Sequence, residues 1–447
     1  MTTTLPAYQA ALERLFGLER GGGKLGLTGI RVLLEALGRP ERHFAATHVA
    51  GTNGKGSTSC YLERLWRETT LVTGLYTSPH LVDFRERIRI GGVAVSAEEV
   101  LEACDGLTRL PESVGRTFFE AATGIAFRLL ADRHVQAGVI EVGLGGRLDS
   151  TNVIEPSVCV ITPIGLDHTD LLGPTLAHVA GEKAGILKPG VPAVIAPQHA
   201  SVIKVIEQAA AEQKTEVVRV SGRARVASAK PGPEGTDVRL ATRDFGPLAF
   251  RLRSLGRHQA GNAALAVAAF AVGLERGLRL PSGGRLRPDK PAPAALERAL
   301  AQARWPGRLE RSAREPRVYW DGAHNPHGAR VLRRAWREAM SDAPAALVLG
   351  MSADKDARGF LRTMRGPWRK VFTAAPDTAR AADPEMLARE AGAAWGVPTR
   401  ARASVAEALS EALEWVGSRG CVLVTGSLFT VGDAMRALGD PPPEALP

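Results

Sequence analysis

The 447-residue chain is poor in aromatic side chains and in cysteine. Aromatic residues make up 5% of the sequence, and only 4 of them are tyrosines. A surface that stacks nucleic-acid bases needs aromatic side chains, so nucleic acid is not an expected partner. The four cysteines, at positions 60, 104, 159 and 421, lie far apart and form no CxxC pair. This spacing argues against a disulfide framework or a zinc site and favours a reducing cytoplasm.

Long apolar runs and blocks of like charge are also missing. No apolar stretch approaches the roughly 20 residues that span a bilayer, and the N-terminus lacks the basic start and apolar core of a signal peptide. We therefore expect a cytoplasmic protein with no membrane partner. We also expect a monomer. The net charge is +10, but lysine and arginine are spread along the chain. Such a charge suits small polyanions, such as a nucleoside triphosphate or a polycarboxylate.

The first part of the chain alternates between strand-like and helix-like segments. Its apolar runs include "FAATHVAG", "LVTGLYT", "AGVIEVG" and "VCVITPIG". This alternation predicts an α/β fold with a mostly parallel sheet, helices on both faces and ligands at the carboxyl ends of the strands. Three further strand-like segments, "TEVVRV", "DVRLAT" and "LAFRLRS", follow one another without the alternation of strands and helices. They predict a small antiparallel addition to this unit.

A segment rich in proline, glycine and charge divides the chain. Residues 277–304 contain "LRLPSGGRLRPDKPAP" and predict a linker. We expect an N-terminal nucleotide-binding unit over residues 1–290. A smaller, Rossmann-like α/β unit is expected over residues 305–447, where strand-like and helix-like segments alternate again.

The stretch "HVAGTNGKGST" places a glycine-rich turn between a strand and a helix. Backbone N–H groups and the positive end of the helix dipole then meet at one point, which favours an anion. Lys55 adds a charge that can reach the outer phosphates. The sequence differs from the usual phosphate-loop motif at two positions. Gly56 follows Lys55 where Ser or Thr is expected, and Val49 replaces the first Gly. The alternative is a turn with a solvated lysine.

Polar residues follow the other predicted strands. Glu141 ends "AGVIEVG" and is a candidate Mg²⁺ ligand, since Mg²⁺ takes carboxylates together with phosphate oxygens. His168, after "VCVITPI", repeats this geometry and is expected beside Glu141 in strand order. The alternatives are an exposed acidic strand end and a structural histidine. For Lys183, in "GEKAGILKPG", the spacing alone predicts an exposed lysine on a helix.

Three more clusters stand at predicted strand ends. "TSPHLVDFRERI" offers the hydroxyl of Ser78 and the imidazole of His80. "WPGRLE" contains Arg308, whose planar fork suits phosphate. "DGAHNP" contains Asp321, which could accept hydrogen bonds from ribose hydroxyls.

These motifs, with "EVGLGGRLDSTN", "LDHTDLLGPT", "EKAGILKPG" and "HQAGNA", occur in an order that resembles the folylpolyglutamate synthases and dihydrofolate synthases. The resemblance runs from about residue 5 to about residue 435. The related Mur ligases share ATP-dependent amide chemistry, but they usually carry Thr or Ser directly after the loop lysine. With Gly56 at this position, the loop resembles that of the folate enzymes and not that of the Mur ligases.

The resemblance implies a role for each matching residue. ATP would be held by Asn53, Gly54, Lys55, Gly56, Asn262, Arg308 and Asp321. Mg²⁺ would be held by Ser78, Glu141, His168 and Lys183, with Lys183 N-carboxylated. The pterin-bearing substrate would contact Lys24, Leu25, Gly26, His80, Thr117, Phe118, Phe119, Glu120, Leu148, Asp149 and Ser150. Lys24 departs from the acidic residue that the family often has before Leu-Gly, which makes this contact the least secure. Lys55, Glu141, His168 and Lys183 would be the catalytic group.

The implied reaction joins L-glutamate to dihydropteroate or a reduced folate, with ATP and an acyl phosphate intermediate. We expect both activities in one chain, because His80 and Arg147 together resemble the bacterial members that accept dihydropteroate. Arg147 could instead form only a loop salt bridge. A monofunctional folylpolyglutamate synthase, a Mur-type ligase, a phosphate-loop ATPase or kinase, and a nucleic-acid-binding module remain the alternatives.

Overall fold

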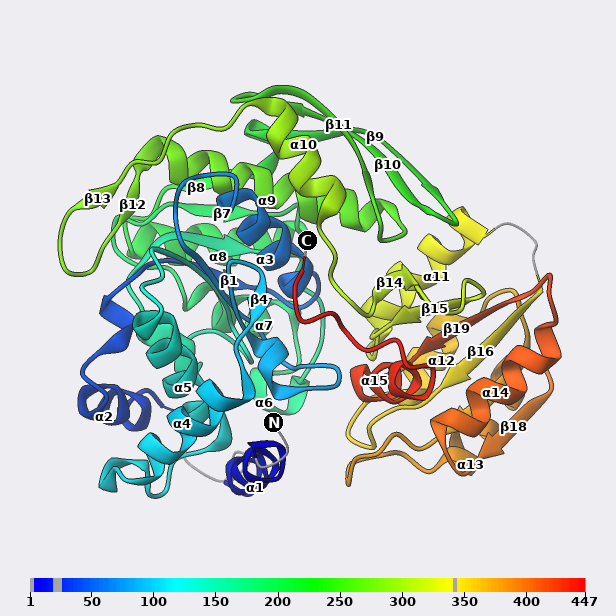
Figure 1. Cartoon of the computed structure of the whole chain (residues 1–447). Helices are drawn as coiled ribbons and strands as arrows, with labels where there is room; N and C mark the ends of the chain where they lie inside the picture. The colour runs from blue at the N-terminus through cyan, green and yellow to red at the C-terminus, as the bar shows by residue number, and fades with distance from the viewer. Residues whose placement is uncertain (1–3, 19–25, 341–343, 447) are drawn as a thin grey trace.

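The computed structural model describes residues 4–18, 26–340 and 344–446 and shows two α/β units (Figure 1). The N-terminal unit is built on an eight-stranded sheet in the order β4-β3-β2-β5-β1-β6-β7-β8. Its strands are β1 (Ala45–Ala50), β2 (Thr73–Tyr76), β3 (Ile88–Ile90), β4 (Val93–Ala94), β5 (Ala137–Glu141), β6 (Pro156–Ile161), β7 (Ala193–Ile195) and β8 (Val217–Arg219). All pairs from β2 to β8 are parallel, and β3 and β4 add an antiparallel edge.

Helices cover both faces of this sheet, as the sequence predicts. They are α1 (Thr4–Phe16), α2 (Thr28–Ala36), α3 (Lys55–Trp66), α4 (Ala97–Thr108), α5 (Phe118–Asp132), α6 (Thr169–Leu172), α7 (Leu176–Ala184), α8 (Ala200–Glu212) and α9 (Arg257–Arg276). Side chains alternate along β1, so Val49 packs with α3 and α9 while Ala50 packs with α7 and α8. None of the described helices combines the length and the apolar character needed to cross a bilayer.

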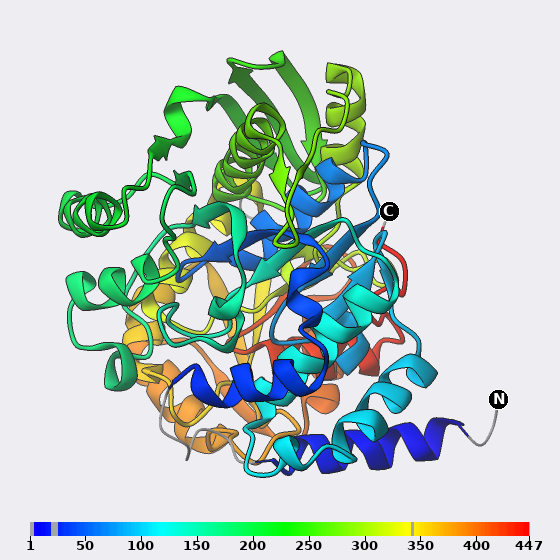
Figure 2. The ribbon, with the colours of Figure 1, turned by 90° about the vertical axis from the view of Figure 1, so that its left-hand side faces the viewer.

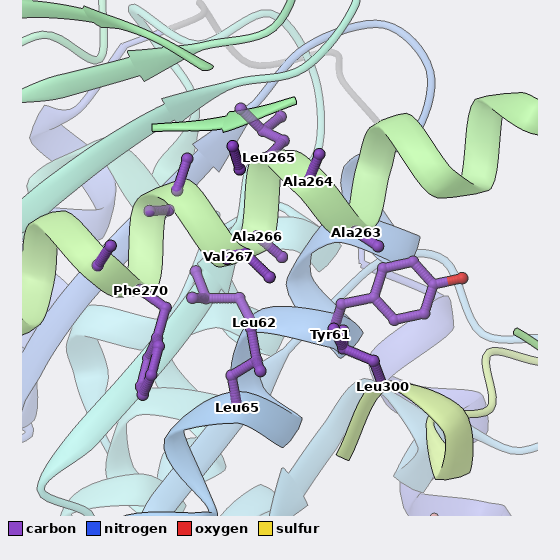
Figure 3. Close-up of a cluster of buried hydrophobic side chains, with 14 of the residues drawn as sticks. Tyr61, Leu62, Leu65, Ala263, Ala264, Leu265, Ala266, Val267, Phe270 and Leu300 are labelled. Carbon is purple, nitrogen blue, oxygen red and sulfur yellow. The ribbon is translucent and has the colours of Figure 1, made fainter. Parts of the chain in front are cut away.

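Helix α3, which follows the glycine-rich loop, is fixed by the main core of this unit. Figure 3 shows Leu62 and Leu65 of α3 facing Ala266, Val267 and Phe270 of the alanine-rich α9. Small side chains let the two helix backbones approach closely, and the larger ones fill the space between them. The loop at the start of α3 is therefore attached to a rigid element.

The antiparallel addition is present, but its first strand is not the predicted one. It consists of β9 (Ala224–Gly232), β10 (Gly235–Thr242) and β11 (Gly246–Leu252), in the order β11-β10-β9. "DVRLAT" and "LAFRLRS" form β10 and β11, whereas "TEVVRV" supplies β8, which pairs with β7 in parallel. The prediction for "TEVVRV" is wrong because α8 returns the chain to the far end of the main sheet. Figure 2 shows the green antiparallel strands and the dark blue α1 at opposite ends of the molecule.

The predicted linker holds regular structure. Within residues 277–304 lie a short hairpin, β12 (Leu278–Arg279) with β13 (Arg285–Leu286), and α10 (Pro293–Gln302). Leu296, Ala299 and Leu300 of α10 join the core that contains α3 and α9. The connection without regular structure therefore narrows to residues 303–307, before β14 begins. The unit boundaries given above stay a prediction.

The C-terminal unit is a six-stranded sheet in the order β14-β15-β19-β16-β17-β18. Its strands are β14 (Arg308–Arg311), β15 (Val318–Asp321), β16 (Ala345–Leu349), β17 (Trp368–Ala374), β18 (Thr399–Arg402) and β19 (Cys421–Thr425). Only β14 is antiparallel to its neighbour. Helices α11 (Pro326–Met340), α12 (Ala357–Met364), α13 (Pro384–Trp395), α14 (Val405–Val416) and α15 (Leu428–Ala437) cover its two faces. The predicted fold class is confirmed.

After α15 the chain crosses back to the N-terminal unit, where the C-terminus is marked in Figure 1. We call residues 441–446 the C-terminal strap. Its backbone pairs with the edge of the large sheet, since Ala94 N donates to Glu444 O at 2.8 Å and Leu446 N donates to Gly92 O at 2.9 Å. The buried Arg89 guanidinium donates to Glu444 O at 2.7 Å and to Pro443 O at 3.0 Å. The strap thus ties the two units together.

Candidate active site

The glycine-rich loop joins the end of β1 to the start of α3, in the predicted strand-turn-helix order. Gly54 precedes Lys55 with a φ of 88°, a left-handed conformation that favours glycine. A Cβ at Gly54 would also lie 2.6 Å from Oδ1 of Asn262, on α9. Both observations explain why this position is glycine. The backbone N–H groups at the start of α3 are therefore presented at the carboxyl edge of the sheet, where an anion is favoured.

Glu141 ends β5, the strand beside β1, and its carboxylate faces the loop lysine. Lys55 Nζ lies 3.9 Å from Glu141 Oε1, and Ser78 N donates to Glu141 Oε2 at 3.3 Å. Burial raises the pKa of Glu141, while the charges of Lys55 and Arg308 oppose this shift. The structure thus brings Lys55, Ser78 and Glu141 together, as predicted.

His168 does not stand beside Glu141 in strand order, which corrects the prediction. Strand β1 lies between β5 and β6, so Glu141 and the loop after β6 flank the glycine-rich loop on opposite sides. The Nε2 atom of His168 lies 3.1 Å from Nζ of Lys355, in the C-terminal unit. Strand order depends on which β-strands pair across the sheet, and the residue spacing does not contain this information.

A Mg²⁺ site is only partly assembled by the protein side chains. Among the described residues, no group of three or more His, Cys, Asp and Glu side chains is placed to hold a metal. This donor set still fits Mg²⁺, which uses one or two carboxylates and completes its shell with phosphate oxygens and water. Glu141, a buried carboxylate beside the loop lysine, is the protein ligand that this geometry favours. The metal-binding roles of Ser78, His168 and Lys183 stay predictions.

Lys183 is buried on α7, so the exposed lysine indicated by its spacing is wrong. Burial and the charge of Lys55 together lower the pKa of its amine to about 7, although Asp167, Asp149 and Glu182 oppose the shift. The loop after Glu141 packs on this helix, since a Cβ at Gly146 would lie 3.0 Å from Lys183 Cα. The amine is therefore held near neutrality beside the phosphate loop.

The C-terminal unit contributes Arg308 and Asp321, which face each other across β14 and β15. Arg308 lines a narrow cavity of about 20 Å³ together with Ser78 and Glu141. Burial raises the pKa of Asp321 to about 6, although Arg308 opposes the shift. Asn53 of the loop contacts His327, with Nδ2 2.6 Å from Nδ1. Both units therefore meet directly at the phosphate loop.

A larger cavity of about 920 Å³ opens between the two units. Asp167, after β6, accepts hydrogen bonds from Asn325 at 2.8 Å and from Lys355 at 3.2 Å. Burial alone would raise the pKa of Asp167, but the hydrogen bond and charge of His324 and the charge of Lys355 hold it well below its usual range. His324, Asn325 and Lys355 were not identified from the sequence, although "DGAHNP" contains the first two.

Comparison with known proteins decides the family. A model of the Mur ligase middle domain matches residues 49–270, and the Mur ligase, glutamate ligase domain matches residues 307–428. The dihydrofolate synthase/folylpolyglutamate synthase of Bacillus subtilis is 32% identical, and the match covers 97% of this chain and 99% of that protein. The protein of the same name from Mycobacterium tuberculosis is 33% identical over 93% of this chain and 90% of the relative. This chain belongs to the dihydrofolate synthase/folylpolyglutamate synthase family.

Solved structures of this family have the same fold as this chain. Mycobacterium tuberculosis folylpolyglutamate synthase, complexed with ADP and AMPPCP, superposes with a TM-score of 0.88 at 31% identity and covers 98% of this chain and 100% of that one. Escherichia coli FolC in complex with DHPP and ADP gives a TM-score of 0.84 at 28% identity, with 98% of both chains covered.

The family's substrate positions fall into two groups here. Lys24 and Leu25 lie outside the described residues, and Gly26 stands at their edge. His80 is half-buried, packs near Phe16 and Phe84, and accepts a hydrogen bond from Arg87 Nε at 2.8 Å. Burial and the charge of Arg87 lower the pKa of His80 to about 3. His80 is therefore a neutral acceptor whose Nδ1 is already occupied.

Thr117 and Glu120 form a capping box at the start of α5. Thr117 N donates to Glu120 Oε2 at 2.8 Å, and Glu120 N donates to Thr117 Oγ1 at 3.2 Å. The ring of Phe118 packs against that of Phe16 in a tilted arrangement, with centroids 5.4 Å apart. The ring of Phe119, in α5, packs against the loop after β5, since a Cβ at Gly143 would be 2.4 Å from its Cζ. These residues have structural roles, and their contacts with substrate stay predictions.

Asp149 organises the glycine-rich loop that follows Glu141. Its carboxylate accepts from Leu144 N at 2.8 Å and from Thr151 N at 3.0 Å. The hydroxyl of Thr151 in turn lies 2.9 Å from Nε2 of the buried His48, in β1. Ser150 is buried beside Asp149, whereas Leu148 is 39% exposed.

Arg147 forms the loop salt bridge that was the alternative to a substrate role. Its Nη2 donates to Gly181 O at 3.0 Å, and its Nε lies 3.4 Å from Glu182 Oε1. The guanidinium therefore lends no support to the prediction of two activities.

Proposed function

We propose that this protein is an ATP-dependent ligase that adds L-glutamate to dihydropteroate and to reduced folates. One observation carries the proposal beyond family membership. Lys55 and Glu141 of the N-terminal unit meet Arg308 of the C-terminal unit around the phosphate loop. Cationic groups from both units can then surround one triphosphate, and the larger cavity beside them leaves room for a second, acidic substrate.

The proposed chemistry has two steps. A carboxylate oxygen of the folate-type acid attacks the γ-phosphorus of ATP, and the bond to ADP breaks. The amine of glutamate then attacks the acyl phosphate carbon, loses a proton and expels phosphate. The first step needs position and charge neutralisation more than covalent help, which Lys55, Arg308 and the N-terminus of α3 supply. Because an acyl phosphate hydrolyses readily, the meeting of the two units also serves to exclude water.

Mg²⁺ would be held by Glu141 and Ser78 together with phosphate oxygens, and it would neutralise charge that develops on the transferred phosphoryl group. Lys183 would hold it as a carbamate, which forms when the neutral amine takes up CO₂ and releases a proton. The depressed pKa of Lys183 supports this step, because the neutral amine is the reactive form. His168 would have to exchange its contact with Lys355 to join the site.

We infer that one chain carries both activities. The relatives from Bacillus subtilis, Mycobacterium tuberculosis and Escherichia coli are each named dihydrofolate synthase/folylpolyglutamate synthase. A relative from Lacticaseibacillus casei, 31% identical, is named folylpolyglutamate synthase alone. We also propose a cytoplasmic monomer; the four cysteines, all buried free thiols, fit a reducing compartment.

Steady-state phosphate release tests the proposal. One purified preparation is assayed with ATP and Mg²⁺, with dihydropteroate or tetrahydrofolate, each with and without L-glutamate. We expect sustained release only when an acid and glutamate are both present, with either acid. Turnover of one acid class alone would reduce the function to that single activity. Release that needs neither acid nor glutamate would indicate an ATPase.

A further inference from the structure

Trp305, in the short connection between the two units, lies directly against Gly56 of the phosphate loop. A Cβ placed on Gly56 would be 2.6 Å from Nε1 of Trp305 and 3.1 Å from its Cε2. In the usual phosphate loop, this position is Ser or Thr, and its hydroxyl binds Mg²⁺. The indole nitrogen of this chain therefore occupies the space that such a side chain would fill.

The segment that carries Trp305 is held against α3 by contacts of the residues that precede it. Arg304 O accepts from the thiol of Cys60 in α3 at 3.5 Å, and Gln302 Oε1 accepts from Arg64 Nη2, also in α3, at 2.8 Å. Arg304 Nε is paired with the buried Glu310 at 3.0 Å. The ring itself packs against the core that contains α3 and α9. The segment that carries Trp305 is thus packed and hydrogen-bonded against α3.

The N–H group of this indole has no acceptor among the described residues. Trp305 is also one of the residues that line the narrow cavity, together with Ser78, Glu141 and Arg308. An indole N–H only donates, so it can bind an anionic oxygen but cannot ligate a metal ion. A free donor beside a helix N-terminus and an arginine is suited to a phosphate oxygen.

We propose that Trp305 is a nucleotide-binding residue whose Nε1–H donates to a phosphate oxygen of ATP, and that position 56 is glycine because this ring takes its place. This rests on the use of ATP in the proposed function. The donor replaces the hydroxyl of the usual loop in position but not in chemistry, because the metal-binding role passes to Ser78 and Glu141. Trp305 also lies three residues before Arg308, so phosphate binding fixes the connection between the two units.

Trp305→Phe tests the hydrogen bond, because it keeps an aromatic ring and removes the N–H. Calorimetric titration with ATP and with ADP should give dissociation constants at least tenfold weaker than those of the wild type, the size expected for one hydrogen bond to a charged group. Trp415→Phe is the matched control, since Trp415 is 40% exposed on α14, and it should bind within twofold of the wild type. Equal affinity of Trp305→Phe and wild type for both nucleotides would overturn the proposal.

A double-mutant cycle tests the steric half of the proposal. Gly56→Ala should weaken ATP binding at least tenfold in the wild-type background and less than twofold in the Trp305→Ala background, where the ring is gone. The same loss in both backgrounds would overturn it. Thermal unfolding of each variant checks that it is folded. Failure of the wild type itself to bind ATP or ADP would contradict the proposed function, whereas the outcomes above concern Trp305 alone.

Discussion

At the scale of single residues, Glu141 is the acidic group on which the site depends. Its carboxylate is buried, 3.9 Å from Lys55, and in the same narrow cavity as Arg308. Burying a carboxylate is unfavourable unless cations or donors offset the cost. The charges of Lys55 and Arg308 oppose the rise in its pKa that burial causes, and the ionised carboxylate would repel phosphate oxygens. The Mg²⁺ ion of the proposed function would remove that conflict.

Glu141→Gln keeps the shape of this side chain and removes its charge. We expect a loss of at least about a hundredfold in Mg²⁺-dependent phosphate release, roughly 3 kcal/mol in the barrier, with unchanged thermal unfolding. Glu155→Gln is the control. Glu155 is exposed, and its ion pair with Arg279 is long, at 4.0 Å. Turnover of Glu141→Gln within about threefold of the wild type would show that the charge is not used.

The carbamate proposed for Lys183 predicts that activity depends on pH and on CO₂. Burial lowers the pKa of Lys183 in the folded protein to about 7, from the ordinary lysine value of 10.5, so the reactive neutral amine gains population as pH rises through 7. Between about pH 7 and 10.5 the unfolded chain binds a proton that the folded chain does not, so the stability of the unmodified protein rises with pH in this window. With ¹³C-bicarbonate we expect an NMR carbamate signal that Lys183→Ala abolishes together with activity. A fully active Lys183→Ala variant would exclude the carbamate role.

At the scale of elements, the capping box at the start of α5 gives Thr117 and Glu120 a role that needs no ligand. Thr117→Ala removes the hydroxyl that accepts from Glu120 N and should lower the free energy of unfolding by about 1 kcal/mol. Thr117→Ser should restore most of this loss, because serine caps equally well. Chemical denaturation of the three proteins measures the effect. A Thr117→Ala variant as stable as the wild type would show that the cap contributes nothing.

Much of the fold follows from local pattern, and much of the site does not. The apolar runs that became β1, β5 and β6, and the loop ending in Lys55, could be predicted because each signal lies within a few residues. The order β5-β1-β6 could not, since it depends on pairing between distant segments, and this misplaced His168. The contact between His168 and Lys355 joins residues 187 positions apart. The burial of Lys183 and the place of Trp305 likewise depend on packing between elements.

At the scale of the whole molecule, the C-terminal strap is the second connection between the units. Its backbone supplies acceptors for Arg89, a guanidinium that is 2% exposed and borders the narrow cavity. Without the strap, that buried charge loses both carbonyl partners on Glu444 and Pro443. The strap therefore stabilises the edge of the large sheet and the approach of the two units.

Truncation after Asp440 tests this role. We expect the free energy of unfolding to fall by about 1–3 kcal/mol, because buried donors lose their acceptors. Glu444→Gln, which removes only the ion pair between Arg85 and the exposed Glu444 side chain, should change it by less than about 1 kcal/mol. Thermal scans at one protein concentration compare the variants. A truncated chain with the unfolding midpoint of the wild type would show that the strap is not a stabilising connection.

In the proposed reaction both units act on one acid through an acyl phosphate, and the transfer of an isotope from that acid reveals this intermediate. Dihydropteroate labelled with ¹⁸O in its carboxylate is turned over with ATP, Mg²⁺ and L-glutamate, and the released phosphate and the amide product are analysed by mass spectrometry. We predict one ¹⁸O atom in phosphate for each amide bond formed, because the carboxylate oxygen that attacks ATP leaves with the phosphoryl group. Amide formation with no ¹⁸O in phosphate, or phosphate release with no amide, would contradict the account.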